Sequence, residues 1–294
     1  MALRKSRSDP ALSVAAAYEH CAGIAYSHYE NFPVASWLLP APMRPHIAAI
    51  YAFARTADDF ADEPGRSPDE RYRLLNEWRA KLHASANGAA TDPIFVALAH
   101  TIRERQLPLE LFDDLLSAFR QDVSVTRYET WEDVLDYCRR SANPVGRLVL
   151  RVAGVNDPAV DRSSDALCSA LQLTNFWQDF GVDWNRGRLY IPRQEILAAG
   201  ATEADLDAKR MTAPWKTAMR ACVVTTRALF EAGRPVTDAV SGRLRLELRA
   251  TWLGGMRVLE KIEQLDYDTF THRPTVGKRD IPALALRALV GKPV

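Results

Sequence analysis

The spacing of apolar residues constrains this fold most strongly, because they recur every three or four positions over most of the chain. The alternation typical of half-buried strands joined by hairpin turns is absent. Prolines and glycines fall between the periodic stretches, where helices begin and end. The sequence therefore predicts an all-α bundle, with helices over residues 43–63, 69–84, 94–106, 109–121, 161–184, 214–232 and 237–264.

No glycine-, serine- or proline-rich linker divides the chain. Its 294 residues are near the upper end of what one hydrophobic core supports. We expect one domain over residues 1–294, with residues 1–15 frayed ahead of the first helix. The short alanine-rich run near the start is bracketed by Asp9 and Glu19, and it is too weakly apolar for a signal peptide.

The charge balance bears on the kind of partner. The chain has 38 basic and 37 acidic residues, a net charge of +1, which argues against nucleic acid because phosphate-backbone binders carry a basic excess. Its four cysteines are scattered without C-x-x-C spacing, which fits a reducing cytoplasm. No stretch has the 18 or more apolar residues of a membrane span. We expect a cytoplasmic protein with a small partner, and a peripheral membrane contact stays open.

Two aspartate pairs of the form D-x-x-x-D, Asp58/Asp62 and Asp179/Asp183, stand in segments that are otherwise apolar and aromatic. Residues four apart lie one above the other on a helix, so each pair places two carboxylates on one stripe. Tyr51 and Arg55 share the first stripe, and Gln172 and Asn175 share the second, within arcs of roughly 60° and 80°. Acid pairs also occur by chance on solvated helix faces. The two pairs described above differ from such chance pairs because they have aromatic and amide neighbours.

Stacked carboxylates repel one another, and burying them is costly unless a cation lies between them. Oxygen ligands in this number suit Mg²⁺, which is usually held by a few carboxylates together with substrate phosphates. The chain has neither a P-loop nor a G-x-G-x-x-G fingerprint, so a nucleotide substrate is disfavoured. The sequence therefore predicts a magnesium-dependent site for a phosphorylated small molecule.

The two motifs resemble those of a known family. The segments YAFARTADDFADE (residues 51–63) and LQLTNFWQDFGVDWNRGRLYIP (residues 171–192) are similar to motifs of the squalene/phytoene synthase family. The resemblance covers residues 18–280. It implies an all-α class I isoprenoid synthase fold around a central cavity, where Mg²⁺ holds a prenyl diphosphate between two aspartate-rich helices.

The resemblance also implies roles for individual residues. It assigns the metal ligands Asp58, Asp62, Asn175, Asp179 and Asp183. Tyr51, Arg55 and Gln172 match positions that contact substrate, Tyr137 matches a tyrosine lining the cavity, and Arg188 matches a residue that closes the site. We also expect a helix break near Asn143–Pro144. The C-terminal residues 271–280 are a candidate for covering the site mouth, but the sequence does not show that they do.

Departures from the family pattern narrow the expected reaction. Where family members have a segment like H-S-K-S-F, this chain reads His28-Tyr29-Glu30-Asn31-Phe32, and Gln178 replaces an arginine before the second motif. Two phosphate-binding cations are thus missing, so we expect one bound diphosphate. The segments HYENFPVASWLLP (residues 28–40) and NFWQD (residues 175–179) resemble those of a bacterial subgroup, the hydroxysqualene synthases of hopanoid biosynthesis, which act on a single presqualene diphosphate and add water. Tyr29, Glu30 and Gln178 are our candidates for positioning that water.

Two other interpretations stay open. One is a two-substrate condensing enzyme, namely a presqualene diphosphate, squalene or phytoene synthase. The other is a non-catalytic helical assembly protein of the same fold, which the two complete aspartate motifs disfavour. For the preferred reaction no hydride donor such as NADPH is expected. Peripheral contact with the inner membrane and with neighbouring hopanoid-pathway enzymes is also consistent with the resemblance.

Overall fold

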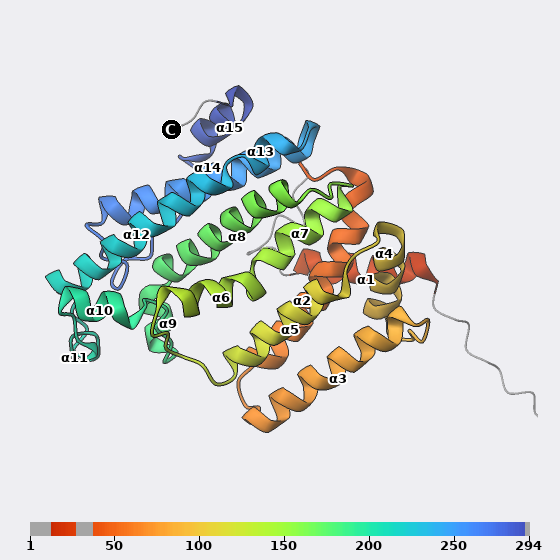
Figure 1. The fold of residues 1–294 in the computed structure, drawn as a ribbon, viewed down its shortest axis with the longest axis horizontal. Coiled ribbons are helices and arrows are strands. Elements are labelled where there is room, and N and C mark those ends of the chain that lie inside the picture. The colour runs from red at the N-terminus through yellow and green to blue at the C-terminus, as the bar shows by residue number, and fades with distance from the viewer. Residues whose placement is uncertain (1–12, 28–37, 292–294) are drawn as a thin grey trace, which may run out of the picture.

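The computed structural model describes residues 13–27 and 38–291, and all regular elements in these residues are helices (Figure 1). The all-α prediction is confirmed. In chain order the elements are α1 (Val14–Ser27), η2 (Ala41–Met43), α2 (Arg44–Asp62), α3 (Pro68–Ala86), α4 (Pro93–Arg105), α5 (Leu109–Asp122), α6 (Trp131–Ser141), α7 (Asn143–Val152), α8 (Pro158–Gln178), α9 (Phe180–Asn185), α10 (Arg193–Ala199), α11 (Glu203–Asp207), α12 (Ala213–Gly233), α13 (Val236–Ala239), α14 (Gly242–Gln264) and α15 (Ile281–Val290).

Two long helices organise the bundle. In the C-terminal half, α8 is central and contacts α6, α7, α12, α13 and α14, while in the N-terminal half α2 contacts α1, α3, α4 and α5 (Figure 1). The halves meet where α5 packs on α6 and α7. One cluster of buried side chains includes members from α1 through α15. Among the described residues, no helix combines the length and the apolar character that a membrane crossing needs.

Local sequence signals explain several helix starts. Ser67 accepts a hydrogen bond from the Glu70 amide at the start of α3, and Asp157 accepts one from the Ala159 amide at the start of α8. Thr130 forms a reciprocal capping box at the start of α6. Each cap satisfies a backbone N–H that lacks a helical partner. Two of these starts belong to α6, which carries Tyr137, and to α8, which leads into the second motif.

Two of the expected helices are divided in the structure. The stretch 161–184 is interrupted at Asp179, and 237–264 is split into α13 and α14. At Asp179 the backbone has φ −98° and ψ 12°, so one residue leaves helical geometry. The expected break near Asn143–Pro144 is confirmed, because α6 ends at Ser141 and α7 begins at Asn143.

The helices α8 and α12 approach each other closely in the bundle core. A Cβ added to Gly233, the last residue of α12, would lie 2.5 Å from the Leu167 backbone nitrogen on α8. Trp177 on α8 also donates a hydrogen bond of 2.8 Å to the Thr226 hydroxyl on α12. These two contacts fix the helix that carries Gln172 and Asn175.

Candidate active site

The first aspartate motif occupies the last turns of α2. Arg55 forms ion pairs with Asp58 at 3.4 Å and with Asp59 at 2.6 Å, one turn further along the helix. Asp59 was not among the predicted site residues, although it lies within reach of the same guanidinium. Tyr51 is half-buried, and its pKa is raised by burial. The predicted stripe of Tyr51, Arg55 and Asp58 is therefore a cluster of interacting polar groups.

The second motif spans the junction of α8 and α9. Although Asp179 leaves helical geometry, the hydrogen bonds of the helix continue through it: its amide donates to the Asn175 carbonyl at 2.9 Å, and the Asp183 amide donates to the Asp179 carbonyl at 2.8 Å. The spacing predicted from the sequence is thus preserved. Asn175 is exposed, and Gln172 is half-buried.

Arg188 connects the two motifs. It follows α9 and forms a bidentate pair with Asp62 on α2, with distances of 2.5 and 3.3 Å from its two terminal nitrogens to the two carboxylate oxygens. Only 18% of the Arg188 side chain is exposed, against 38% for Asp62. Asp62 is also close enough to raise the pKa of Asp183. The two aspartate motifs, distant in sequence, therefore face a common region.

Three acids in this region have raised pKa values. Burial, and then the neighbouring Asp62, raise the pKa of Asp58 to about 6, although Arg55 opposes the shift. Burial, and then Asp179, raise the pKa of Asp183 to about 7. Such shifts mean that the fold holds carboxylates close together at a cost to their charged forms. A bound cation would relieve that cost.

The third of these acids, Asp122 at the end of α5, was missed by the sequence analysis. Burial raises its pKa to about 7, while a hydrogen bond from the Tyr137 hydroxyl (2.9 Å) and the charge of Arg188 oppose the rise. Asp62 and Asp58 are also among the charges that raise it. Asp122 has no acidic partner at helical spacing in the sequence, so only its long-range neighbours reveal it.

The C-terminal segment, residues 271–280, contacts the second motif. Arg273 forms an ion pair with Asp179, and the Gln178 amide donates to the Pro274 carbonyl at 2.6 Å. The Phe270 carbonyl lies so close to Gly181 that any side chain there would collide with it. Gln178, a candidate for positioning water, thus also holds this segment in place.

An aromatic group adjoins the carboxylates. Phe176 and Tyr190 stack with centroids 3.6 Å apart, and Tyr137 packs beside both. All three are buried. Trp177 and Trp252 instead donate to core partners, the Thr226 hydroxyl and the Phe230 carbonyl, both at 2.8 Å. Tyr137, Phe176 and Tyr190 therefore form an aromatic cluster beside Asp122, to which Tyr137 donates a hydrogen bond.

The carboxylate and amide oxygens of the two motifs suit a hard divalent ion. In the structure Arg55, Arg188 and Arg273 pair with three of the carboxylates. Within residues 13–27 and 38–291, no three or more histidine, cysteine or acidic side chains already stand at metal-binding distances. Mg²⁺ needs fewer protein ligands than this, because diphosphate oxygens and water complete its shell. The Arg55 Nε is buried and has no hydrogen-bond partner in the described part of the chain, so it can donate to an anion. Tyr29 and Glu30 lie outside the described residues.

The fold and the site together define a class of protein: an all-α bundle in which two aspartate-bearing helices face a shared region beside buried aromatic residues. The squalene/phytoene synthase family model matches residues 26–280. The chain belongs to this family, whose enzymes act on prenyl diphosphates.

Named relatives agree with the family assignment. Hydroxysqualene synthase from Rhodopseudomonas palustris is 38% identical, covering 81% of this chain and 80% of the relative. The enzyme of the same name from Zymomonas mobilis is 36% identical, covering 90% and 88%. The crystal structure of squalene synthase HpnC from Alicyclobacillus acidocaldarius has 40% identity and a TM-score of 0.82, covering 86% of this chain and 95% of that one.

Proposed function

We propose that this protein is a Mg²⁺-dependent hydroxysqualene synthase, which converts one presqualene diphosphate and water into hydroxysqualene and diphosphate. The observation that carries the proposal is the position of Arg188, which pairs with Asp62 of the first motif and perturbs Asp183 of the second. Acids from both motifs therefore face one region, which supports a site where Mg²⁺ would link them to a single diphosphate. The similarity to two hydroxysqualene synthases supports the choice of reaction.

Asp58, Asp62, Asn175, Asp179 and Asp183 would hold the ion, through carboxylate and amide oxygens. When bound, Mg²⁺ supplies positive charge that stabilises the diphosphate as it leaves. Burial and neighbouring acids disfavour the charged forms of Asp58 and Asp183, so a cation would relieve that cost. The arginine pairs of Asp58, Asp62 and Asp179 would open to admit it.

The chain's own groups would do the rest of the work. Arg55 would donate its unpaired Nε–H to a diphosphate oxygen, a charge-assisted hydrogen bond. The ester C–O bond breaks with its electron pair going to diphosphate, and the carbocation rearranges before water adds and loses a proton. Aromatic faces stabilise nearby cations, and Tyr137, Phe176 and Tyr190 would supply them while excluding bulk water.

The proposal is tested by incubating the purified protein and Mg²⁺ with either presqualene diphosphate or farnesyl diphosphate, followed by lipid analysis. We expect hydroxysqualene from presqualene diphosphate only. Consumption of farnesyl diphosphate alone would favour the second candidate, a two-substrate condensing enzyme, which the likeness to a protein named squalene synthase keeps in view. No turnover of either would contradict both.

Aspartate variants test the roles within the site. Asp58→Asn and Asp179→Asn should each lower the rate by roughly 100-fold or more, the scale for losing one group that stabilises developing charge. Because the fold disfavours the charged form of Asp58, Asp58→Asn should not lower the melting temperature. Asp207→Asn, at an exposed position, is the matched control and should retain full activity.

A further inference from the structure

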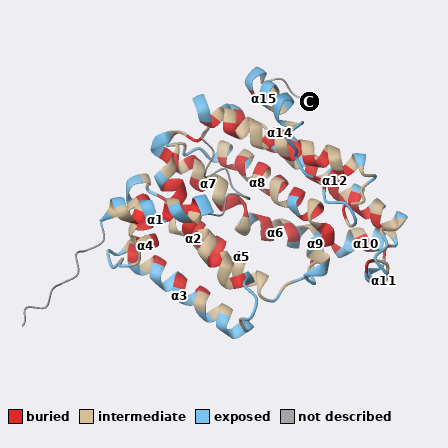
Figure 2. Ribbon diagram, turned by 180° about the vertical axis from the view of Figure 1, so that it is seen from behind, coloured by how far each residue is buried: buried red, intermediate tan, exposed pale blue. Residues whose placement is uncertain are grey.

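The last described helix, α15, presents an apolar face to solvent. Its exposed large side chains are Ile281 (56%), Leu286 (63%), Leu289 (66%) and Val290 (56%), and of its ten residues only Ala288 is buried. At about 100° per residue, the exposed positions cover an arc of roughly 200° without a polar side chain. Figure 2 shows α15 largely in the exposed colour. Apolar residues scattered singly on a surface need no explanation, but a whole helix face does.

The residues around this face are basic. Residues 271–291 contain four basic residues and one acidic residue, whereas the whole chain is nearly neutral. Lys278 and Arg279 are exposed just before the helix, and neither is ion-paired within the described chain. The single acid, Asp280, is neutralised by Arg257 at 2.9 Å and Lys261 at 2.6 Å. The apolar face is therefore bordered by positive charge.

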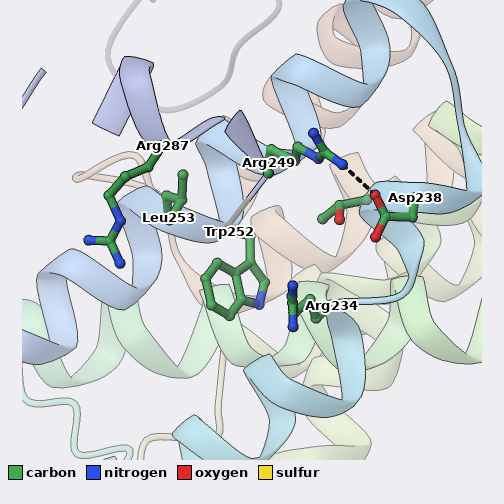
Figure 3. Close-up of a pocket in the computed structure, with 8 residues that line it drawn as sticks. Arg234, Asp238, Arg249, Trp252, Leu253 and Arg287 are labelled. Atoms are coloured by element: carbon green, nitrogen blue, oxygen red, sulfur yellow. Dashed lines mark hydrogen bonds and ion pairs between the residues drawn. The ribbon is translucent and has the colours of Figure 1, made fainter. Parts of the chain in front are cut away.

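A small hollow at the C-terminal end of α15 adds to this charge. Arg234, Arg249 and Arg287 line it beside Trp252, and Asp238 pairs with Arg249 at 2.6 Å (Figure 3). Asp238 is the one carboxylate among the described residues that line the hollow, so Arg234 and Arg287 add positive charge beyond the Arg249 pair. Guanidinium groups bind phosphate oxygens well because their N–H donors match phosphate geometry.

We propose that α15 and its basic border form a docking surface for an anionic phospholipid bilayer. Ten residues span about 15 Å, half of the roughly 30 Å hydrocarbon thickness, so the helix would lie in the membrane interface and not cross it. Lys278, Arg279 and the hollow would face lipid phosphates while the apolar side chains enter the acyl boundary. This surface lies on the outer side of α14 (Figure 1), and the inference does not depend on the chemistry proposed above.

Charge favours a bilayer over a second copy of the chain. In a symmetric dimer the same patch lies on both subunits, so pairing the α15 faces would bring the two sets of cations together. An anionic surface instead attracts each cation, and each Lys or Arg near the membrane strengthens binding about fivefold. The two occupants are separated by measuring both vesicle binding and oligomeric state.

The test is sedimentation of the full chain with vesicles of phosphatidylcholine, with and without phosphatidylglycerol. Leu286→Glu/Leu289→Glu should weaken binding to the anionic vesicles about tenfold or more. The matched control, Leu197→Glu/Val224→Glu, changes side chains of the same exposure (65% and 63%) on α10 and α12, and it should bind as the wild type does. Equal binding by both double variants would overturn the proposal.

The charge component has its own variant. Lys278→Glu/Arg279→Glu should lose binding to the phosphatidylglycerol vesicles and show little change with phosphatidylcholine alone. Light scattering should find the wild type and Leu286→Glu/Leu289→Glu in the same oligomeric state. If the wild type does not sediment with vesicles, or if Leu286→Glu/Leu289→Glu dissociates a dimer, the surface is not a membrane-docking site.

Discussion

Replacing Arg188 directly tests whether its positive charge offsets the negative charge of the carboxylates around it, Asp62, Asp122 and Asp183. The Arg188 guanidinium pairs with Asp62, and its charge opposes the rise that burial causes in the pKa values of Asp122 and Asp183. Replacing Arg188 with Gln removes both effects. Breaking a fully buried ion pair costs about 3–5 kcal/mol, and an exposed one less than about 1 kcal/mol. The Arg188 and Asp62 side chains are 18% and 38% exposed, so this pair lies between the buried and the exposed case. We expect the free energy of unfolding to fall by about 1–3 kcal/mol.

The assay is thermal unfolding with a chelator and again with Mg²⁺. The melting temperature of Arg188→Gln should fall by about 2–6 °C in chelator, at roughly 2 °C per kcal/mol for a chain of this size. Mg²⁺ should raise it more than it raises the wild type, because the freed carboxylates bind the ion.

The control is Arg73→Gln, whose partner Glu77 is 56% exposed, and it should behave as the wild type does. If Arg188→Gln and the wild type have the same melting temperature in chelator, or if Mg²⁺ raises both melting temperatures equally, Arg188 does not offset the charge of these carboxylates.

Two further predictions concern stability. Gly233→Ala should destabilise the fold by about 1–3 kcal/mol in urea unfolding, because its Cβ would collide with the Leu167 backbone. Gly23→Ala, with no atom within 4 Å of an added Cβ, is the control, and equal stability of both variants would contradict the account. Burial, and then Arg105, lower the pKa of His46. Its protonation therefore opposes folding, so below pH about 6.5 the wild type should lose stability relative to His46→Gln. The raised pKa values of Asp58, Asp122 and Asp183 act in the opposite direction, but they do so in both proteins. The difference between the two urea midpoints, measured at pH about 7.5 and again at about 5.5, decides this.

The sequence was sufficient for the longer helices of the bundle and for the two stripes of polar residues, because helical periodicity is a local property. It did not predict α10, α11 or α15. It could not show which charges would meet. Asp122 stands alone near the end of α5, and its partners Tyr137 and Arg188 come from later segments. No spacing rule joins residues brought together only by tertiary packing.

The interruption at Asp179 has a similar origin. The residues around it continue the apolar periodicity, so the pattern predicts one helix through 184. The structure instead packs the Phe270 carbonyl against Gly181 and pairs Arg273 with Asp179. These contacts come from a segment distant in sequence. The metal-ligand set inferred from the family resemblance stays a prediction.

Calorimetric titration with inorganic diphosphate tests the central claim most directly, that both aspartate motifs hold one diphosphate through Mg²⁺. The account predicts binding that requires Mg²⁺ and that is lost in Asp58→Asn and in Asp179→Asn alike. Binding that survives a chelator, or that persists unchanged in either variant, would contradict it.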